Sequence, residues 1–143
     1  FFGLVAVIGS NFLYSKSIDI KLFLPAIAIG MLITAVLNLN NMRDIENDRV
    51  AQKNTLIVKF GLKFGLNYQN ILIFTPIMLV VVFFLMMNDK LAFGFALFAG
   101  YLFVHKNYIS KVTNPKDFDP ELKKIALTTF FLSIFIALKL VAN

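Results

Sequence analysis

Three side chains at the end of a long apolar stretch have the types and the spacing to bind a metal ion. Asn40, Asp44 and Asp48 follow one another at intervals of four residues. On a helix, successive members are offset by about 40° around the axis, so all three share one face. Mg²⁺ prefers such oxygen ligands, commonly one or two carboxylates together with substrate phosphates. We therefore predict a Mg²⁺ site with Asp44 and Asp48 as catalytic ligands and Asn40 as a further ligand.

Basic side chains accompany these oxygen ligands. Arg43, Arg49 and Lys53 lie in the same stretch, and a metal-bound polyphosphate also requires cations. We predict that these three residues bind a diphosphate. A substrate with a diphosphate head and a lipid tail would suit the end of a membrane helix.

A solvated loop between two membrane spans would also mix acidic and basic residues, and spacing alone leaves both interpretations open. One feature favours a site. Asn38, Asn40 and Asn41 lie on the membrane side of the charges, where an amide is costly unless it has partners.

The elements that position these residues are predicted to be membrane helices. Of the 143 residues, 59% are hydrophobic and 15% are charged, and the mean hydropathy is +0.78. A soluble domain carries about 25% charged residues. The chain has no Cys, which excludes disulfides and thiol chemistry.

Apolar runs predict an all-α, polytopic transmembrane helix bundle, because a spanning helix needs about 20 mostly apolar residues. The chain begins inside its first apolar run, so we expect it to be a piece of a longer protein. Within the single unit 1–143, the expected spans are about 1–14, 20–41, 68–87, 91–109 and 121–142.

Two short segments show helix signals between the spans. Thr55 and Gly61 are predicted to begin and end a short helix at the membrane interface. Asp119 is predicted as the N-cap of the last span, with Pro120 at the first helical position. The only His, His105, is interpreted as an interfacial or packing residue, with a place at a cavity mouth as the alternative.

The basic residues are divided unevenly between the two ends of the predicted spans. Segments 43–63 and 106–124 hold ten of them, and the opposite ends hold four, namely Lys16, Lys21, Lys90 and Lys139. The positive-inside rule places loop 42–66 in the cytoplasm and the C-terminus outside. This topology accounts for the net charge of +6, so nucleic acid is not expected as a partner.

The segment "NNMRDIENDRVAQKNTLIVKFG" at 40–61 resembles the second aspartate motif of the UbiA-type intramembrane prenyltransferases, whose members read N-N-x-R-D-x-x-x-D-x-x-x-x-K-x-T-L-x-V-x-x-G. It is most similar to members that act on 1,4-dihydroxy-2-naphthoate in menaquinone synthesis. One departure is Gln52, where the family usually has Gly, and this leaves the conformation of the loop open. The matching positions are Asn40, Asn41, Arg43, Asp44, Asp48, Lys53, Thr55, Leu56, Val58 and Gly61.

The resemblance implies the second half of a nine-helix prenyltransferase fold in the bacterial inner membrane. Two Mg²⁺ ions would bind between this motif and a first aspartate motif in the missing N-terminal half, so residues 1–143 alone are expected to be inactive. Asn41 and Thr55 would support the site. The reaction implied is transfer from a polyprenyl diphosphate to 1,4-dihydroxy-2-naphthoate, giving demethylmenaquinone, CO2 and diphosphate.

Two other functions stay open at this point. Another aromatic acceptor would suit the same motif. A non-enzymatic transporter or scaffold would also live in the bilayer, although transporters more often place charges or broken helices near the midplane. Here the centres of the predicted spans are uncharged.

Overall fold

The computed structural model describes residues 1–88 and 94–142, and every regular element in this part of the chain is helical. The α-helices are α1 (Leu4–Ser15), α2 (Phe23–Arg43), α3 (Ile45–Val50), α4 (Leu56–Phe60), α5 (Leu62–Met86), α6 (Phe95–Ile109) and α7 (Asp119–Ala142). Two 3₁₀ turns, Ile20–Leu22 and Pro115–Phe118, lead into α2 and α7. The predicted all-α class is confirmed.

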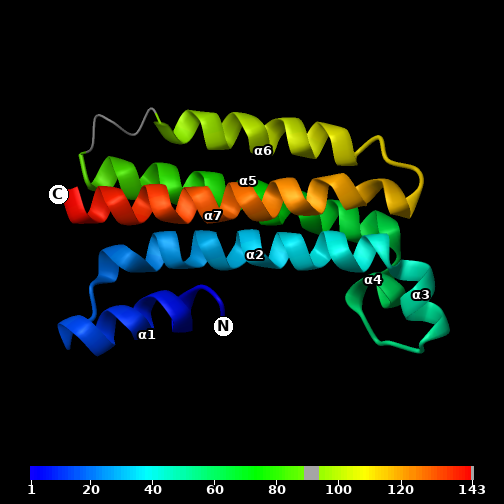
Figure 1. Cartoon of the computed structure of the whole chain (residues 1–143), viewed down its shortest axis with the longest axis horizontal. Coiled ribbons are helices and arrows are strands. Elements are labelled where there is room, and N and C mark those ends of the chain that lie inside the picture. The colour runs from blue at the N-terminus through cyan, green and yellow to red at the C-terminus, as the bar shows by residue number, and fades with distance from the viewer. Residues whose placement is uncertain (89–93, 143) are drawn as a thin grey trace.

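The long helices run antiparallel to their neighbours in the chain and form one bundle, with α1 beside the first part of α2 (Figure 1). The short helices α3 and α4 lie at one end of the bundle, together with the connection between α6 and α7. We call this end the motif end, because it holds residues 40–61. Segments 43–63 and 106–124, which hold most of the basic residues, therefore lie at the same end. Which side of a membrane this end faces stays a prediction.

The observed helices lie where the spans were predicted, with one clear difference at the start of α5. By length and composition, Ile20–Arg43 and Leu62–Met86 are able to cross a membrane. The second of these begins six residues before the predicted position 68, because polar residues such as Lys63 and Asn67 continue the helix instead of ending it. The start of the predicted span 91–109 lies outside the described residues.

Helix α2 is the centre of the bundle, since it packs against α1, α5 and α7. Small residues allow close approach: Ala28 and Ala35 are fully buried, and a Cβ on Gly30 would lie 3.0 Å from the Cα of Gly3 on the α1 side. Small residues at such crossings are typical of membrane helices. Larger side chains, among them Leu32 and Leu39, fill the remaining interior.

The outside of the bundle is also apolar. Large side chains that are more than half exposed occur along several helices, including Leu85, Leu97, Phe103 and Leu138. A soluble protein rarely exposes so much apolar surface, whereas lipid or further helices would cover it without cost. This surface fits the predicted membrane bundle.

Gly65 provides a test of the packing between α2, α4 and α5. A Cβ at this position would lie 2.7 Å from the Sδ of Met42 and 2.8 Å from the Cδ1 of Ile57. We expect Gly65→Ala to lower the free energy of unfolding by about 1–3 kcal/mol through overpacking, measured as thermal unfolding of the full-length protein in detergent. The control is Gly100→Ala, where a Cβ meets nothing within 4 Å. A stability loss no larger than that of the control would contradict the packing described.

Candidate functional site

The predicted metal ligands lie where α2 ends and α3 begins. The prediction of one continuous helix is corrected by Asp44, whose angles of φ −94° and ψ 9° separate the two helices. The interruption is small. The amide of Asp44 still donates to the Asn40 carbonyl (3.0 Å), and the amide of Asp48 donates to the Asp44 carbonyl (2.8 Å). The four-residue spacing therefore still places the three residues in successive turns.

Arg43 binds the first aspartate and two further acceptors. Its Nε and Nη2 atoms donate to the two carboxylate oxygens of Asp44, both at 2.8 Å. Nη2 also donates to the side-chain oxygen of Asn40 (2.9 Å), and Nη1 donates to Asp119 (2.7 Å). Asp119 belongs to α7, so a single guanidinium joins the end of α2 to the start of the last helix.

The second aspartate is paired with Lys53. The Asp48 side chain is only 6% exposed, and its Oδ1 accepts a hydrogen bond from the Lys53 Nζ at 2.8 Å. The Lys53 amide also donates to the Asp48 carbonyl (2.9 Å), so both backbone and side chain close the turn after α3. The remaining predicted cation, Arg49, pairs with the exposed Glu46 at 3.2 Å. Each predicted diphosphate-binding residue is therefore paired with a carboxylate of this chain.

The conformation of Gln52 explains why Gly suits this position in the family pattern. Its φ is +53°, a left-handed conformation that Gly adopts readily and that other residues adopt at a cost of about 1–2 kcal/mol. A Gly at this position would form the same turn without strain. The turn that brings Lys53 back to Asp48 is thus retained, although its usual residue is not.

The residues predicted to support the site lie at helix ends. The Thr55 hydroxyl accepts a hydrogen bond from the Val58 amide (3.2 Å), which confirms the predicted N-cap of α4. Gly61, with φ +85°, separates α4 from α5 and confirms the predicted end of the short helix. Asn41 is partly buried in the last turn of α2.

Hydrogen bonds between the cations and the carboxylates change the pKa values of Asp44 and Lys53. The hydrogen bonds from Arg43 lower the pKa of Asp44, and the charges of Arg43 and Lys53 lower it further, against the opposing effect of partial burial. The hydrogen bond to Asp48 raises the pKa of Lys53. Asp44 is therefore ionised at neutral pH, as a metal ligand must be.

The acidic residues present fit one side of a Mg²⁺ site. Within residues 1–88 and 94–142 there is no group of three or more His, Cys, Asp or Glu side chains placed to hold a metal. Asp44, Asp48 and the amide oxygen of Asn40 are hard oxygen donors of the kind that Mg²⁺ selects. Further ligands would have to come from a second element.

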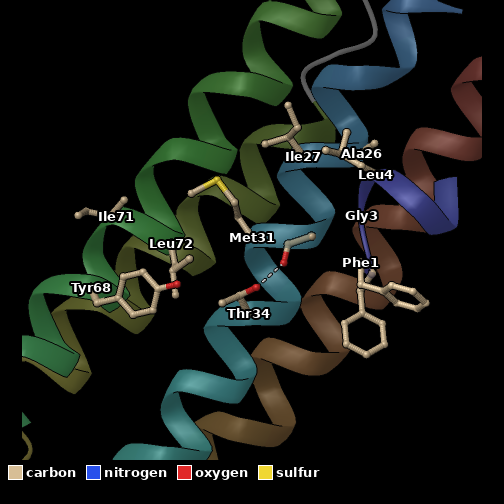
Figure 2. Close-up of a pocket in the computed structure, with 12 residues that line it drawn as sticks. Phe1, Gly3, Leu4, Ala26, Ile27, Met31, Thr34, Tyr68, Ile71 and Leu72 are labelled. Atoms are coloured by element: carbon tan, nitrogen blue, oxygen red, sulfur yellow. Dashed lines mark hydrogen bonds between the residues drawn. The ribbon is translucent and has the colours of Figure 1, made fainter. Parts of the chain in front are cut away.

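An apolar groove of about 460 Å³ extends from the motif between α2 and α7. Its lining consists of Phe2, Ile33, Thr34, Val36, Leu37, Asn40, Leu122, Ala126 and Thr129. A second cavity of about 360 Å³ lies between α1, α2 and α5 and shares Phe2 and Thr34 with the first. Figure 2 shows this second cavity, with Thr34 bonded to the Gly30 carbonyl and Tyr68 extending from α5 toward it. Together the two cavities extend along α2 away from Asn40.

A chain of buried polar side chains crosses the bundle below the motif, and the sequence analysis missed it. Asn38 on α2 donates to the Gly65 carbonyl (3.0 Å) and to the Gln69 Oε1 (2.8 Å) on α5. The Gln69 Nε2 lies 3.4 Å from the Nε2 of His105 on α6. The Nδ1 of His105 lies 2.6 Å from the Oε2 of Glu121 on α7. Four helices are thereby connected.

The polar chain is well matched in donors and acceptors. A neutral His105 with its proton on Nδ1 gives every bond one donor and one acceptor. The four side chains are at most 4% exposed. Glu121 also accepts hydrogen bonds from Tyr101 (3.3 Å) and Lys124 (2.8 Å). His105 is a buried packing residue, as interpreted, but the side chains that it contacts through its ring nitrogens are polar.

Asp119 differs from its predicted role. It has helical angles, φ −57° and ψ −45°, and is the first residue of α7 instead of its N-cap. Its carboxylate is bound by Arg43, 76 residues earlier. A pairing over this distance leaves no signal in local sequence.

The chain resembles known proteins over nearly its whole length. The model of the UbiA prenyltransferase family matches residues 1–135. A Haemophilus influenzae protein named 1,4-dihydroxy-2-naphthoate octaprenyltransferase is 35% identical over 98% of this chain and 46% of its own length. The Escherichia coli protein of the same name is 36% identical over 96% of this chain and 47% of its own length. No solved structure matches the chain. The chain thus spans about half the length of the curated relatives it matches.

The buried polar chain predicts a large effect at Glu121. Glu121→Ala would leave the Nδ1 of His105 without an acceptor, and we expect a loss of about 1–3 kcal/mol in unfolding free energy, measured by thermal unfolding in detergent. Glu121→Gln keeps an acceptor and should lose less. The control is Glu46→Ala at the exposed ion pair, with an expected change within about 0.5 kcal/mol. Equal losses at Glu121 and Glu46 would contradict the role of the polar chain.

Proposed function

Because the chain belongs to the UbiA prenyltransferase family, we propose that the full-length protein transfers a polyprenyl group from its diphosphate to 1,4-dihydroxy-2-naphthoate. The observation that carries this proposal is the pair Asp44 and Asp48, each with its own cation, at the end of an apolar helix. The names of the relatives support naphthoate over another aromatic acceptor. Family membership also favours an enzyme over a transporter or scaffold.

In this proposal Asp44, Asp48 and Asn40 hold Mg²⁺ on one side, and residues outside this chain complete the site. When bound, Mg²⁺ neutralises the diphosphate and makes it a better leaving group. Arg43, Arg49 and Lys53 bind phosphate oxygens after they release Asp44, Glu46 and Asp48, respectively. Asp44 and Asp48 are then free for the metal.

The proposed prenyl transfer needs no oxidant. The bond between prenyl C1 and the diphosphate oxygen breaks, and both electrons leave with the diphosphate. The ring carbon that carries the carboxylate forms the new bond to C1, and CO2 then departs and returns its electron pair to the ring. The immediate product is the reduced form of demethylmenaquinone.

The polyprenyl tail is proposed to lie in the apolar groove that starts at Asn40. The groove begins beside the motif and continues between α2 and α7 past Thr34, so the reacting end of the donor would lie at the metal and the rest among apolar side chains. Burial of the tail contributes about 0.8 kcal/mol per CH₂ group. A long donor would therefore bind chiefly through this groove.

The metal ligands are tested by isosteric substitution in the full-length protein. Asp44→Asn and Asp48→Asn should each lower prenyl transfer at least about a hundredfold, because a charged ligand is lost where charge develops in the transition state. Glu46→Gln is the matched control, since Glu46 is exposed and bonded only to Arg49 among the described residues; its activity should stay within about twofold of wild type. The measurement is prenylated naphthoate formed per minute at saturating Mg²⁺. Near-normal turnover of either Asn variant would exclude the metal assignment.

The tail groove is tested with donors of different length. Thr34→Phe should fill the groove and lower kcat/KM for a long donor by about tenfold, through overpacking of about 1–3 kcal/mol, with a smaller effect on a geranyl donor. Thr128→Phe is the control, because Thr128 makes the same hydrogen bond to the carbonyl four residues before it, at 2.8 Å as in Thr34. Thr128 lines neither cavity. Equal losses with both donors would place the tail elsewhere.

A further inference from the structure

Arg43 is bound by Asp119 from outside the motif, on a helix far away in sequence. Of the five N–H donors of a guanidinium, Nε and both Nη2 hydrogens contact Asp44 and Asn40, whereas Nη1 contacts Asp119. The guanidinium thus has one edge on the proposed metal ligands and another edge on α7. Only the first edge must change if Asp44 and Asn40 turn to a metal.

Asp119 lies between two buried residues of the bundle. The residue before it, Phe118, is fully buried. Glu121, two residues after it, is 2% exposed and is the end of the buried polar chain. Asn38, the other end of that chain, lies five residues before Arg43 on α2. The contacts form a closed ring through four helices, and this ring fixes the position of Asp119 relative to Arg43.

Stability alone is a weak reason for the Arg43–Asp119 contact. The Asp119 side chain is 68% exposed, and an exposed ion pair contributes little to stability. An arginine released from Asp44, by contrast, would regain the rotamer freedom of a long side chain. A second carboxylate on Nη1 would prevent that release.

We propose that Asp119 is a positioning residue for the diphosphate. It holds the Nη1 edge of Arg43 when Asp44 and Asn40 turn to Mg²⁺, so that the freed Nε and Nη2 donors stay beside the metal and bind phosphate oxygens. Without Asp119, the guanidinium either stays on Asp44 and competes with the metal or moves into water. Both outcomes weaken binding of the metal–diphosphate complex. This inference rests on the proposed function and adds a residue that the aspartate motif does not contain.

The test compares Asp119→Asn with Asp117→Asn in the full-length protein. Asp117 is a matched control, because it is exposed, lies two residues away in the same segment, and its carboxylate has no hydrogen bond or ion pair within residues 1–88 and 94–142. The first readout is the Kd of a non-hydrolysable prenyl thiolodiphosphate at a series of Mg²⁺ concentrations, measured by calorimetry in detergent. The second readout is the KM for a polyprenyl diphosphate donor, with kcat measured in the same assay.

For Asp119→Asn we expect about a tenfold higher Kd and KM, a higher Mg²⁺ concentration for half-maximal binding, and little change in thermal midpoint. Asp117→Asn should match wild type in all of these. If Asp119→Asn lowers the thermal midpoint and leaves Kd and the Mg²⁺ requirement unchanged, the contact is structural only and the inference is rejected. If wild type binds the analogue without any Mg²⁺ dependence, the proposed function fails, and this inference fails with it.

Discussion

The buried polar chain from Asn38 to Glu121 is the interaction on which the geometry of the motif end depends. The helices are apolar inside and outside, and apolar packing alone specifies rotation and depth weakly when the surrounding lipid is equally apolar. Hydrogen bonds at 2.8 Å and 2.6 Å permit far less variation. Because Asn38 lies near the end of α2 and Glu121 near the start of α7, the chain sets the position of the helix ends that hold the aspartates and Asp119.

The two predicted metal ligands next to this polar chain are each paired with a cation. Asp44 is paired with Arg43 and Asp48 with Lys53, at 2.8 Å in each case. Unpaired carboxylates beside a membrane would repel one another and would also be costly to bury. In the proposed function the same cations bind the phosphate oxygens of the donor, so one set of charges serves both the carboxylates and the substrate. Substrate binding on this view is an exchange of partners, which requires only side-chain movements.

Much of the fold could be predicted from sequence, because spans are set by runs of apolar residues and helix ends by local signals such as Thr55 and Gly61. The aspartate motif could also be found, since its residues are close in sequence. The pairing of Gln69 with His105, and of Arg43 with Asp119, could not be predicted. These partners are 36 and 76 residues apart, and their types are also common in solvated loops. The helix break at Asp44 was not predicted either. It is seen in the φ and ψ angles of this residue, and no Gly or Pro in the sequence marks it.

The buried polar chain has a consequence for biogenesis. During synthesis α2 is made before α5, and the Asn38 amide lacks these two partners until Gly65 and Gln69 follow, 27 and 31 residues later. The ring of His105 in turn needs Glu121, 16 residues further along. Each new helix thus satisfies a polar group left by an earlier one, and α7 completes the series. A nascent chain that stops before α7 leaves the Nδ1 of His105 without its Glu121 acceptor inside the bundle, so the hydrogen bonds of the interior are complete only once α7 has packed.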